Sequence, residues 1–206
     1  MNGTFYMKGL NTMEKQIYLL LTDTGTIFTR MIKLYTKKSY NHASLSFDLF
    51  LNDVYSFGRK NIKNPFIGGF VKEDMENDLF RYANCAIYCC TISEEQWNRV
   101  KAYILQIEQQ KYRYKYNFIG LFGVMLNRHI QRENAFFCSQ FVATALKESI
   151  IADFHKPLSL VTPHDLSRIA SFDLIFKGKL ADYKNYQVKE KEKKTFTSSF
   201  SNMTAI

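Results

Sequence analysis

The sequence predicts an α+β protein in which a small antiparallel sheet packs against helices. Two kinds of hydrophobic spacing support this prediction. Residues 42–48 alternate between polar and apolar side chains, which is typical of a strand with two unlike faces. Residues 93–107 and 137–146 instead repeat apolar side chains at helical spacing. A short turn after residue 48 leads to a second strand-like run, so we expect the first of these strands to form a hairpin.

The composition indicates one packed domain. The chain has 206 residues, 46% of them apolar and 16% aromatic, with only 9 Gly and 3 Pro. We expect a polar leader at 1–15, one domain at 16–183 and a disordered basic tail at 184–206. The longest early apolar run, residues 17–21, is far shorter than the roughly 20 residues that span a bilayer, and no secretory signal precedes it. We therefore expect a cytoplasmic protein without a membrane span.

The net charge of +9 does not by itself indicate a nucleic-acid partner. The tail at 184–206 holds five Lys and two Glu, so it supplies +3 and leaves +6 on the rest of the chain. That remaining charge is scattered among acids, without a basic run that stacking aromatics interrupt. We expect no nucleic-acid partner.

The elements are expected in a definite order along the chain. They are a strand at 17–22, a helix at 27–35, strands at 42–48 and 54–60, a loop that contains Gly68 and Gly69, a strand at 80–92, helices from 93 and from 137, and a last strand at 171–180. The helix after Ser93 has the firmest signal, because Ser93 and Gln96 form a capping box ahead of an apolar stripe.

Three of the four cysteines are expected to be structural. Cys85, Cys89 and Cys90 lie in one strand-like stretch without a His at ligand spacing. Free Cys is frequently buried, and disulfides are rare inside cells. We expect three reduced structural thiols, no metal and no cofactor.

Cys138 differs because it lies in the first turn of a predicted helix. Unpaired N–H groups and the helix dipole stabilise a thiolate there, and the same N–H groups can form half of an oxyanion hole. A nucleophilic thiol also needs a base. His42, on the polar face of its strand, is the first candidate, and His164 is the second. His129 and His155 lie in loop-like stretches and are weaker candidates.

The runs YNHASLSFD, VYSFGRK and FFCSQFVATAL resemble the permuted papain-like hydrolases of the NlpC type, in the branch called YaeF-like or YiiX-like. The resemblance covers about residues 16–170, and in that group the histidine strand precedes the cysteine helix. It implies a sheet that carries His42 and a helix that presents Cys138. It also implies a third polar residue on the next strand, which orients the imidazole.

Matching the hairpin puts Ser56 in this third role, where relatives have an acid or an amide. A hydroxyl cannot stabilise an imidazolium as a carboxylate does, so the role stays open between Ser56 and a group such as Glu73. Asp165 is a further alternative.

The implied activity is hydrolysis of an amide or related acyl bond in a small peptide or acyl-amide, through a thioester on Cys138. We expect Tyr116, Ser139 and Tyr40 to contact the substrate, although an aromatic run such as that around Tyr116 often serves packing. Three alternatives remain: an acyltransferase that uses the same Cys–His pair, a binding module that has lost catalysis, and a nucleic-acid binder.

Overall fold

A six-stranded antiparallel sheet forms the centre of the protein. The computed structural model describes residues 14–24, 39–60, 67–130 and 132–188. The strands run in the spatial order β4-β3-β2-β1-β5-β8, and all five neighbouring pairs are antiparallel. Their bounds are β1 (Lys15–Asp23), β2 (His42–Ser46), β3 (Val54–Arg59), β4 (Gly68–Glu73), β5 (Asn84–Ile92) and β8 (Asp173–Lys179). The predicted α+β class with an antiparallel sheet is confirmed.

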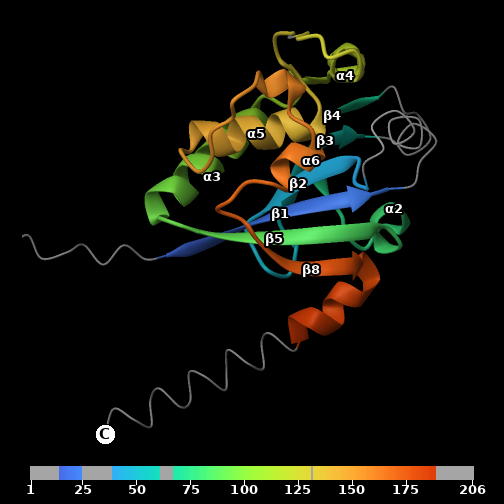
Figure 1. Ribbon diagram of the computed structural model, residues 1–206, viewed down its shortest axis with the longest axis vertical. Coiled ribbons are helices and arrows are strands. Elements are labelled where there is room, and N and C mark those ends of the chain that lie inside the picture. The colour runs from blue at the N-terminus through green and yellow to red at the C-terminus, as the bar shows by residue number, and fades with distance from the viewer. Residues whose placement is uncertain (1–13, 25–38, 61–66, 131, 189–206) are drawn as a thin grey trace, which may run out of the picture.

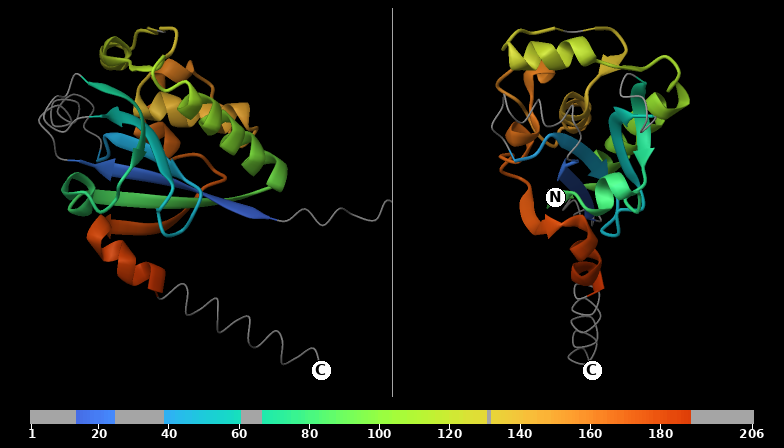
Figure 2. Two further views of the ribbon diagram at one scale, coloured as in Figure 1. Left: turned by 180° about the vertical axis from the view of Figure 1, so that it is seen from behind. Right: turned by 90° about the vertical axis from the view of Figure 1, so that its right-hand side faces the viewer.

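Helices lie on both sides of this sheet (Figures 1 and 2). The helical elements are α2 (Asp78–Arg81), α3 (Glu94–Gln109), α4 (Phe118–Met125), α5 (Cys138–Glu148), the 3₁₀ turn η1 (Leu158–Leu160) and α6 (Pro163–Leu166), and residues 180–188 are also helical. A second, parallel pair joins β6 (Lys115–Tyr116) to β7 (Ala135–Phe136). The helix expected at 27–35 lies outside the described residues.

Each face of the sheet has its own hydrophobic core. On the side of α3 and α5, the fully buried Phe141 of α5 packs with its ring 5.3 Å from that of Phe57 on β3. On the other side, Leu20 of β1 packs in a cluster with Tyr183 from the last helix. Burial on both faces explains why the central strand β1 is apolar almost throughout, without the alternation expected of a half-exposed strand.

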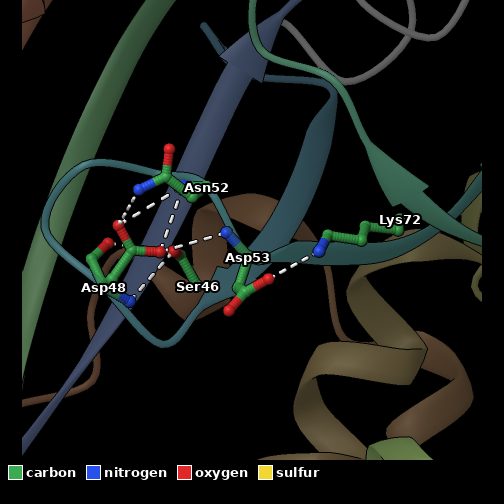
Figure 3. A network of polar contacts seen from close by, with 5 residues as sticks. All are labelled: Ser46, Asp48, Asn52, Asp53 and Lys72. Atoms are coloured by element: carbon green, nitrogen blue, oxygen red, sulfur yellow. Dashed lines mark hydrogen bonds and ion pairs between the residues drawn. The ribbon is translucent and has the colours of Figure 1, made fainter.

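The connection between β2 and β3 is held by one carboxylate (Figure 3). Asp48 accepts backbone N–H groups from Phe50, Asn52 and Asp53, at 2.8 to 3.3 Å. Asp53 in turn pairs with Lys72 of β4 at 2.6 Å. An Asp that satisfies several backbone donors is a common way to close a turn. This network therefore holds the turn of the hairpin that the sequence predicts.

The strand β4 was predicted as part of a loop because of its glycine pair, and this prediction is wrong. The glycines serve close packing and do not mark a turn. A Cβ on Gly68 would lie 2.8 Å from the Cβ of Tyr116, and one on Gly69 would lie 3.0 Å from the Tyr114 carbonyl oxygen. Gly is the residue that permits such close approach within a strand.

Three further boundaries differ from the prediction. The expected strand at 80–92 begins only at Asn84, because Asn77 caps the short helix α2, which buries Phe80. The helix α4 was not predicted from the sequence, and it begins where Asn117 accepts the N–H of Gly120 at 2.8 Å.

The beginning of the expected disordered tail is also ordered. Residues 184–188 continue the helix that starts at 180. Gln187 donates to the carbonyl oxygen of Leu49 at 3.0 Å, and Lys184 pairs with Glu76 at 2.8 Å. These contacts with the loop after β2 and with the segment before α2 explain why the helix extends past 183. Residues 189–206 lie outside the described residues.

Across the described ranges, no helix combines the length and the apolar character needed to cross a membrane.

Candidate active site

His42 and Glu73 form a nearly buried ion pair that bridges two strands of the sheet. The His42 Nε2 atom lies 2.6 Å from Oε1 of Glu73, and the two side chains are 12% and 4% exposed. His42 is the first residue of β2, and Glu73 is the last residue of β4. The strand β3 lies between them in the sheet, so the pair joins residues that are 31 positions apart in the sequence.

Ser44 holds the other oxygen of the same carboxylate. Its hydroxyl donates to Oε2 of Glu73 at 2.5 Å, and its side chain is fully buried. Glu73 therefore has one oxygen on the imidazole and one on a fixed hydroxyl, which orients the carboxylate. The period-two pattern of β2 placed His42 and Ser44 on one face, and their shared contact with Glu73 confirms this.

A glycine and an aromatic ring enclose the pair. A Cβ on Gly58 would lie 3.5 Å from Glu73 Oε1 and 3.7 Å from His42 Cε1, so the backbone of β3 lies directly against both groups. The Phe80 ring lies 6.0 Å from the imidazole, centre to centre. These neighbours exclude water from the pair, and exclusion of water strengthens its electrostatic attraction.

Cys138 is the first residue of α5, as the sequence predicts, and its side chain lies near the His42 imidazole, whose pKa it raises. Since Nε2 of His42 faces Glu73, Nδ1 is the ring nitrogen that remains for the thiol. The imidazole thus lies between an acid and a thiol. This is the arrangement in which a base is oriented by a third group and acts on a nucleophile.

The surroundings of His42 favour its protonated form. Burial alone lowers the pKa of an imidazole, but the charge of Glu73 and the contact with Cys138 outweigh burial and raise the pKa of His42 to about 10. The raised pKa favours the imidazolium form of the ring at neutral pH. Such a ring stabilises a neighbouring thiolate and carries a proton that it can donate.

The start of α5 lacks a side-chain cap. Its N-cap residue is Phe137, which has no acceptor and is buried in the core. The helices α2, α3, α4 and α6 each begin instead with a side-chain oxygen that accepts a backbone N–H. A missing cap costs about 1 kcal/mol. It leaves first-turn N–H groups next to Cys138 without a side-chain acceptor, where they favour negative charge.

Two of the other thiols lie in environments that keep them protonated. Burial raises the pKa of Cys85 to about 12, and burial also raises the pKa of Cys90. Both lie in β5, where they are 0% and 5% exposed, and Cys89 between them is partly buried. None of the four cysteines forms a disulfide bond.

Ser56 does not orient His42, and this expectation is corrected. Its buried hydroxyl donates to the carbonyl oxygen of Ala43 at 2.7 Å. The group against the imidazole is Glu73, the alternative that the sequence left open. Asp165 is engaged elsewhere, since it caps α6 through Thr162 and pairs with Lys156 at 2.6 Å.

The residues expected to contact substrate lie in different surroundings. Ser139 is 2% exposed and its hydroxyl donates to the carbonyl oxygen of Val161 at 2.7 Å, so its side chain serves the core and not a substrate. Tyr40 and Tyr116 are partly buried beside the larger core cluster, and the Tyr116 ring lies 4.6 Å from that of Phe118. Their roles toward a substrate stay predictions.

The other histidines lie on other segments of the chain. His129 is exposed, with Nδ1 at 2.5 Å from the hydroxyl of Ser159, His155 is exposed, and His164 is in α6. The imidazole whose pKa Cys138 raises is that of His42. Within the described part of the chain, no cluster of three or more His, Cys, Asp or Glu side chains could hold a metal ion.

Sequence reasoning missed the contribution of Ser44 and Gly58 to the site. The alternation of β2 was the available signal for Ser44, because it placed this hydroxyl on the face of His42. Gly58 had no such signal, since its position against two side chains depends on the packing of three strands.

Comparison with known proteins adds no relative: no family model, no curated protein and no solved structure matches this chain.

Proposed function

We propose that this protein is a cysteine hydrolase that cleaves an amide or related acyl bond through a thioester on Cys138. The observation that carries the proposal is the position of the His42 imidazole, between the Glu73 carboxylate and the Cys138 thiol. In this role Cys138 is the nucleophile, His42 transfers protons, and Glu73 is a positioning residue that acts through His42.

The proposed reaction has two halves. The Cys138 thiolate attacks the acyl carbon, and the carbonyl electrons move to oxygen in a tetrahedral intermediate. When the intermediate collapses, the carbon–nitrogen bond breaks and His42 gives its proton to the leaving amine. Water then attacks the thioester, His42 takes a proton from that water, and the acid leaves as the Cys138–acyl bond breaks. The site returns to its starting state, because His42 is again protonated and Cys138 is again a thiolate at the end of the cycle.

The start of α5 supplies charge stabilisation in this scheme. The negative oxygen of each tetrahedral intermediate forms next to Cys138, where first-turn N–H groups lack a side-chain acceptor. Removing one oxyanion donor costs about 10²- to 10³-fold in turnover in other acyl-transfer enzymes. The missing cap therefore favours catalysis in this scheme, because a capping side chain would occupy the backbone N–H groups that the oxyanion of the intermediate needs.

We also propose that the fold is the circularly permuted papain-like fold of the NlpC type. Two features support this: the histidine strand β2 precedes the cysteine helix α5 in the chain, and α5 packs against β2 and β3. The His42 and Cys138 motifs are those on which the resemblance rests.

The test is the alkylation of each cysteine, followed by mass spectrometry of peptides. Near neutral pH, iodoacetamide should label Cys138 faster than Cys89, the partly buried thiol that serves as the internal control. His42→Ala should slow the labelling of Cys138 at least about tenfold, because it removes the neighbouring cation. Ser56→Ala should leave that rate almost unchanged.

Two outcomes would refute the proposal. The first is labelling of Cys89 as fast as that of Cys138 in a protein that melts as a folded domain. The second is a His42→Ala variant that keeps the wild-type rate. Cys138→Ser should remove all turnover of acyl-amide substrates without lowering the melting temperature, since the exchange is nearly isosteric.

A further inference from the structure

The helix α4 exposes apolar side chains at one end of the molecule. Its eight residues, FIGLFGVM, contain no charged side chain. Ile119 is 52% exposed, and Leu126, just past the end of the helix, is 66% exposed. Tyr112, before the helix, is 87% exposed. An exposed apolar group on an uncharged helix is a common feature of binding surfaces.

Positive charges flank this helix on both sides. From residue 111 to residue 134 the chain has five cations and one acid, Glu133, a net charge of +4. All five cations are exposed: Lys111, Arg113, Lys115, Arg128 and Arg132. The rest of the chain outside the tail has a net charge of only +2, because 184–206 supplies +3 of the total of +9. The charge outside the tail, which we expected to be scattered, is therefore concentrated around α4, and that expectation is corrected.

This surface adjoins the candidate active site. The backbone N–H of Asn117, which caps α4, donates to the carbonyl oxygen of Phe136 at 2.9 Å, two residues before Cys138. Figures 1 and 2 show α4 beyond one end of α5, on the side of the sheet that α5 covers. A group bound along α4 would thus lie next to the first turn of α5.

We propose that α4 and its flanks, residues 111–130 and 132–134, bind the surface of a membrane that contains anionic phospholipids. The aliphatic side chains of Ile119 and Leu126 enter the boundary between headgroups and acyl chains, while the flanking Lys and Arg contact the headgroup phosphates. An uncharged helix between basic segments has the two components of interfacial binding, buried apolar area and attraction to anionic lipid.

Charge and exposure favour this occupant over two others. A second copy of the chain would place five cations against five cations, and like charges across an interface oppose association. A nucleic acid would be matched by the cations, but it offers no apolar layer for Ile119 and Leu126. The membrane surface is the partner that uses both features.

The test is flotation of the full-length protein with lipid vesicles. Wild type should float with phosphatidylcholine vesicles that contain roughly one third phosphatidylserine, and remain unbound with phosphatidylcholine alone. The double variant Ile119→Ser/Leu126→Ser should lose at least about tenfold in partitioning. Lys115→Gln and Arg128→Gln should each lose about fivefold, and high salt should weaken wild-type binding by screening.

Matched variants distinguish binding through this surface from nonspecific hydrophobic binding and from binding through the tail at 184–206. Leu105→Ser/Leu174→Ser replaces two residues that are 50% and 51% exposed elsewhere, and it should bind like wild type. Replacing the four lysines at 189, 191, 193 and 194 by Gln in the full chain should also leave most binding in place. Cys138→Ser should float like wild type, which keeps this test independent of the chemistry at the thiol.

Several results would overturn the proposal. Wild type that does not float with the anionic vesicles contradicts it, and so does an Ile119→Ser/Leu126→Ser variant that melts and floats like wild type. Loss of binding in the tail variant alone assigns the membrane contact to the tail. A wild-type dimer that the Ile119→Ser/Leu126→Ser variant converts to a monomer, without vesicle binding, assigns the surface to a second copy.

Discussion

Glu73→Gln is the most informative single change, because it keeps the size of the side chain and removes its charge. Gln still offers a carbonyl oxygen to the hydroxyl of Ser44, so the hydrogen-bonded shape of the site is largely retained. The imidazolium of His42 loses the buried carboxylate that lies 2.6 Å from it. Burial lowers the pKa of His42 and is then opposed by fewer groups, so the pKa of His42 should fall in this variant.

The expected magnitude follows from the pKa of His42. One pKa unit corresponds to about 1.4 kcal/mol, so a rise from 6.5 to about 10 sets an upper bound of about 5 kcal/mol on its contribution. Removing one partner of a buried ion pair costs about 3–5 kcal/mol in other proteins. We therefore expect Glu73→Gln to lower the unfolding free energy by about 3–5 kcal/mol at pH 6.

The sign of the pH dependence follows from the direction of the shift. The folded-state pKa of His42 is raised above the unfolded value, so its stabilising contribution is complete below about pH 6.5. The contribution is lost as the pH rises toward about 10, where the folded protein also releases the proton. The difference in unfolding free energy between wild type and Glu73→Gln should therefore shrink steadily from pH 6 to pH 10.

Urea unfolding at pH 6, 8 and 10 measures this difference, and Asp53→Asn is the matched control. Asp53 also pairs at 2.6 Å with a cation of β4, Lys72, but these side chains are 49% and 51% exposed. An exposed pair contributes about 0–1 kcal/mol, so the control should change little and show no trend over this pH range. A Glu73→Gln effect as small as that of Asp53→Asn, or equal at pH 6 and pH 10, would refute the account of a buried imidazolium pair.

Two further pairs of substitutions test the packing around the site. The buried hydroxyl of Thr22, which lies opposite His42 in the β1–β2 register, has no hydrogen-bond partner among the described residues. Thr22→Val should therefore leave the unfolding free energy unchanged or raise it by up to about 1 kcal/mol. Ser56→Ala removes an existing hydrogen bond and should lower the unfolding free energy by about 1 kcal/mol. Gly68→Ala should lower the melting temperature, with a cost of about 1–3 kcal/mol, because the new Cβ would meet Tyr116 at 2.8 Å. Gly58→Ala is the control, because its Cβ would be no closer than 3.4 Å to its neighbours. This account is contradicted if Gly58→Ala loses more stability than Gly68→Ala, or if Thr22→Val loses more stability than Ser56→Ala.

Local patterns in the sequence were sufficient for the elements that depend on near neighbours. Ser93 and Gln96 form the predicted capping box at the start of α3, with both reciprocal hydrogen bonds. The apolar spacing after Phe137 placed Cys138 in the first turn of α5. Each of these features depends on residues within one or two helical turns, so the sequence alone contains the whole interaction.

The partner of His42 could not be found in the same way. The sequence led to Ser56, because Ser56 follows His42 on the next strand of the hairpin. The glycines of β4 suggested a loop, which concealed the strand that presents Glu73. Glycine has a low strand propensity, and only the close approach of Tyr116 to Gly68 shows why it is needed there.

The sequence by itself determined the class of fold, the position of the thiol at a helix start and the polar face that carries His42 and Ser44. The tertiary structure alone decided which acid completes the site and how the charges are balanced. The reason is physical: Glu73 meets His42 across an intervening strand, and the pKa of His42 depends on burial, a carboxylate and a thiol that come from three separate parts of the chain. Neither a contact across the sheet nor the exclusion of water from it is a property of any local run of residues.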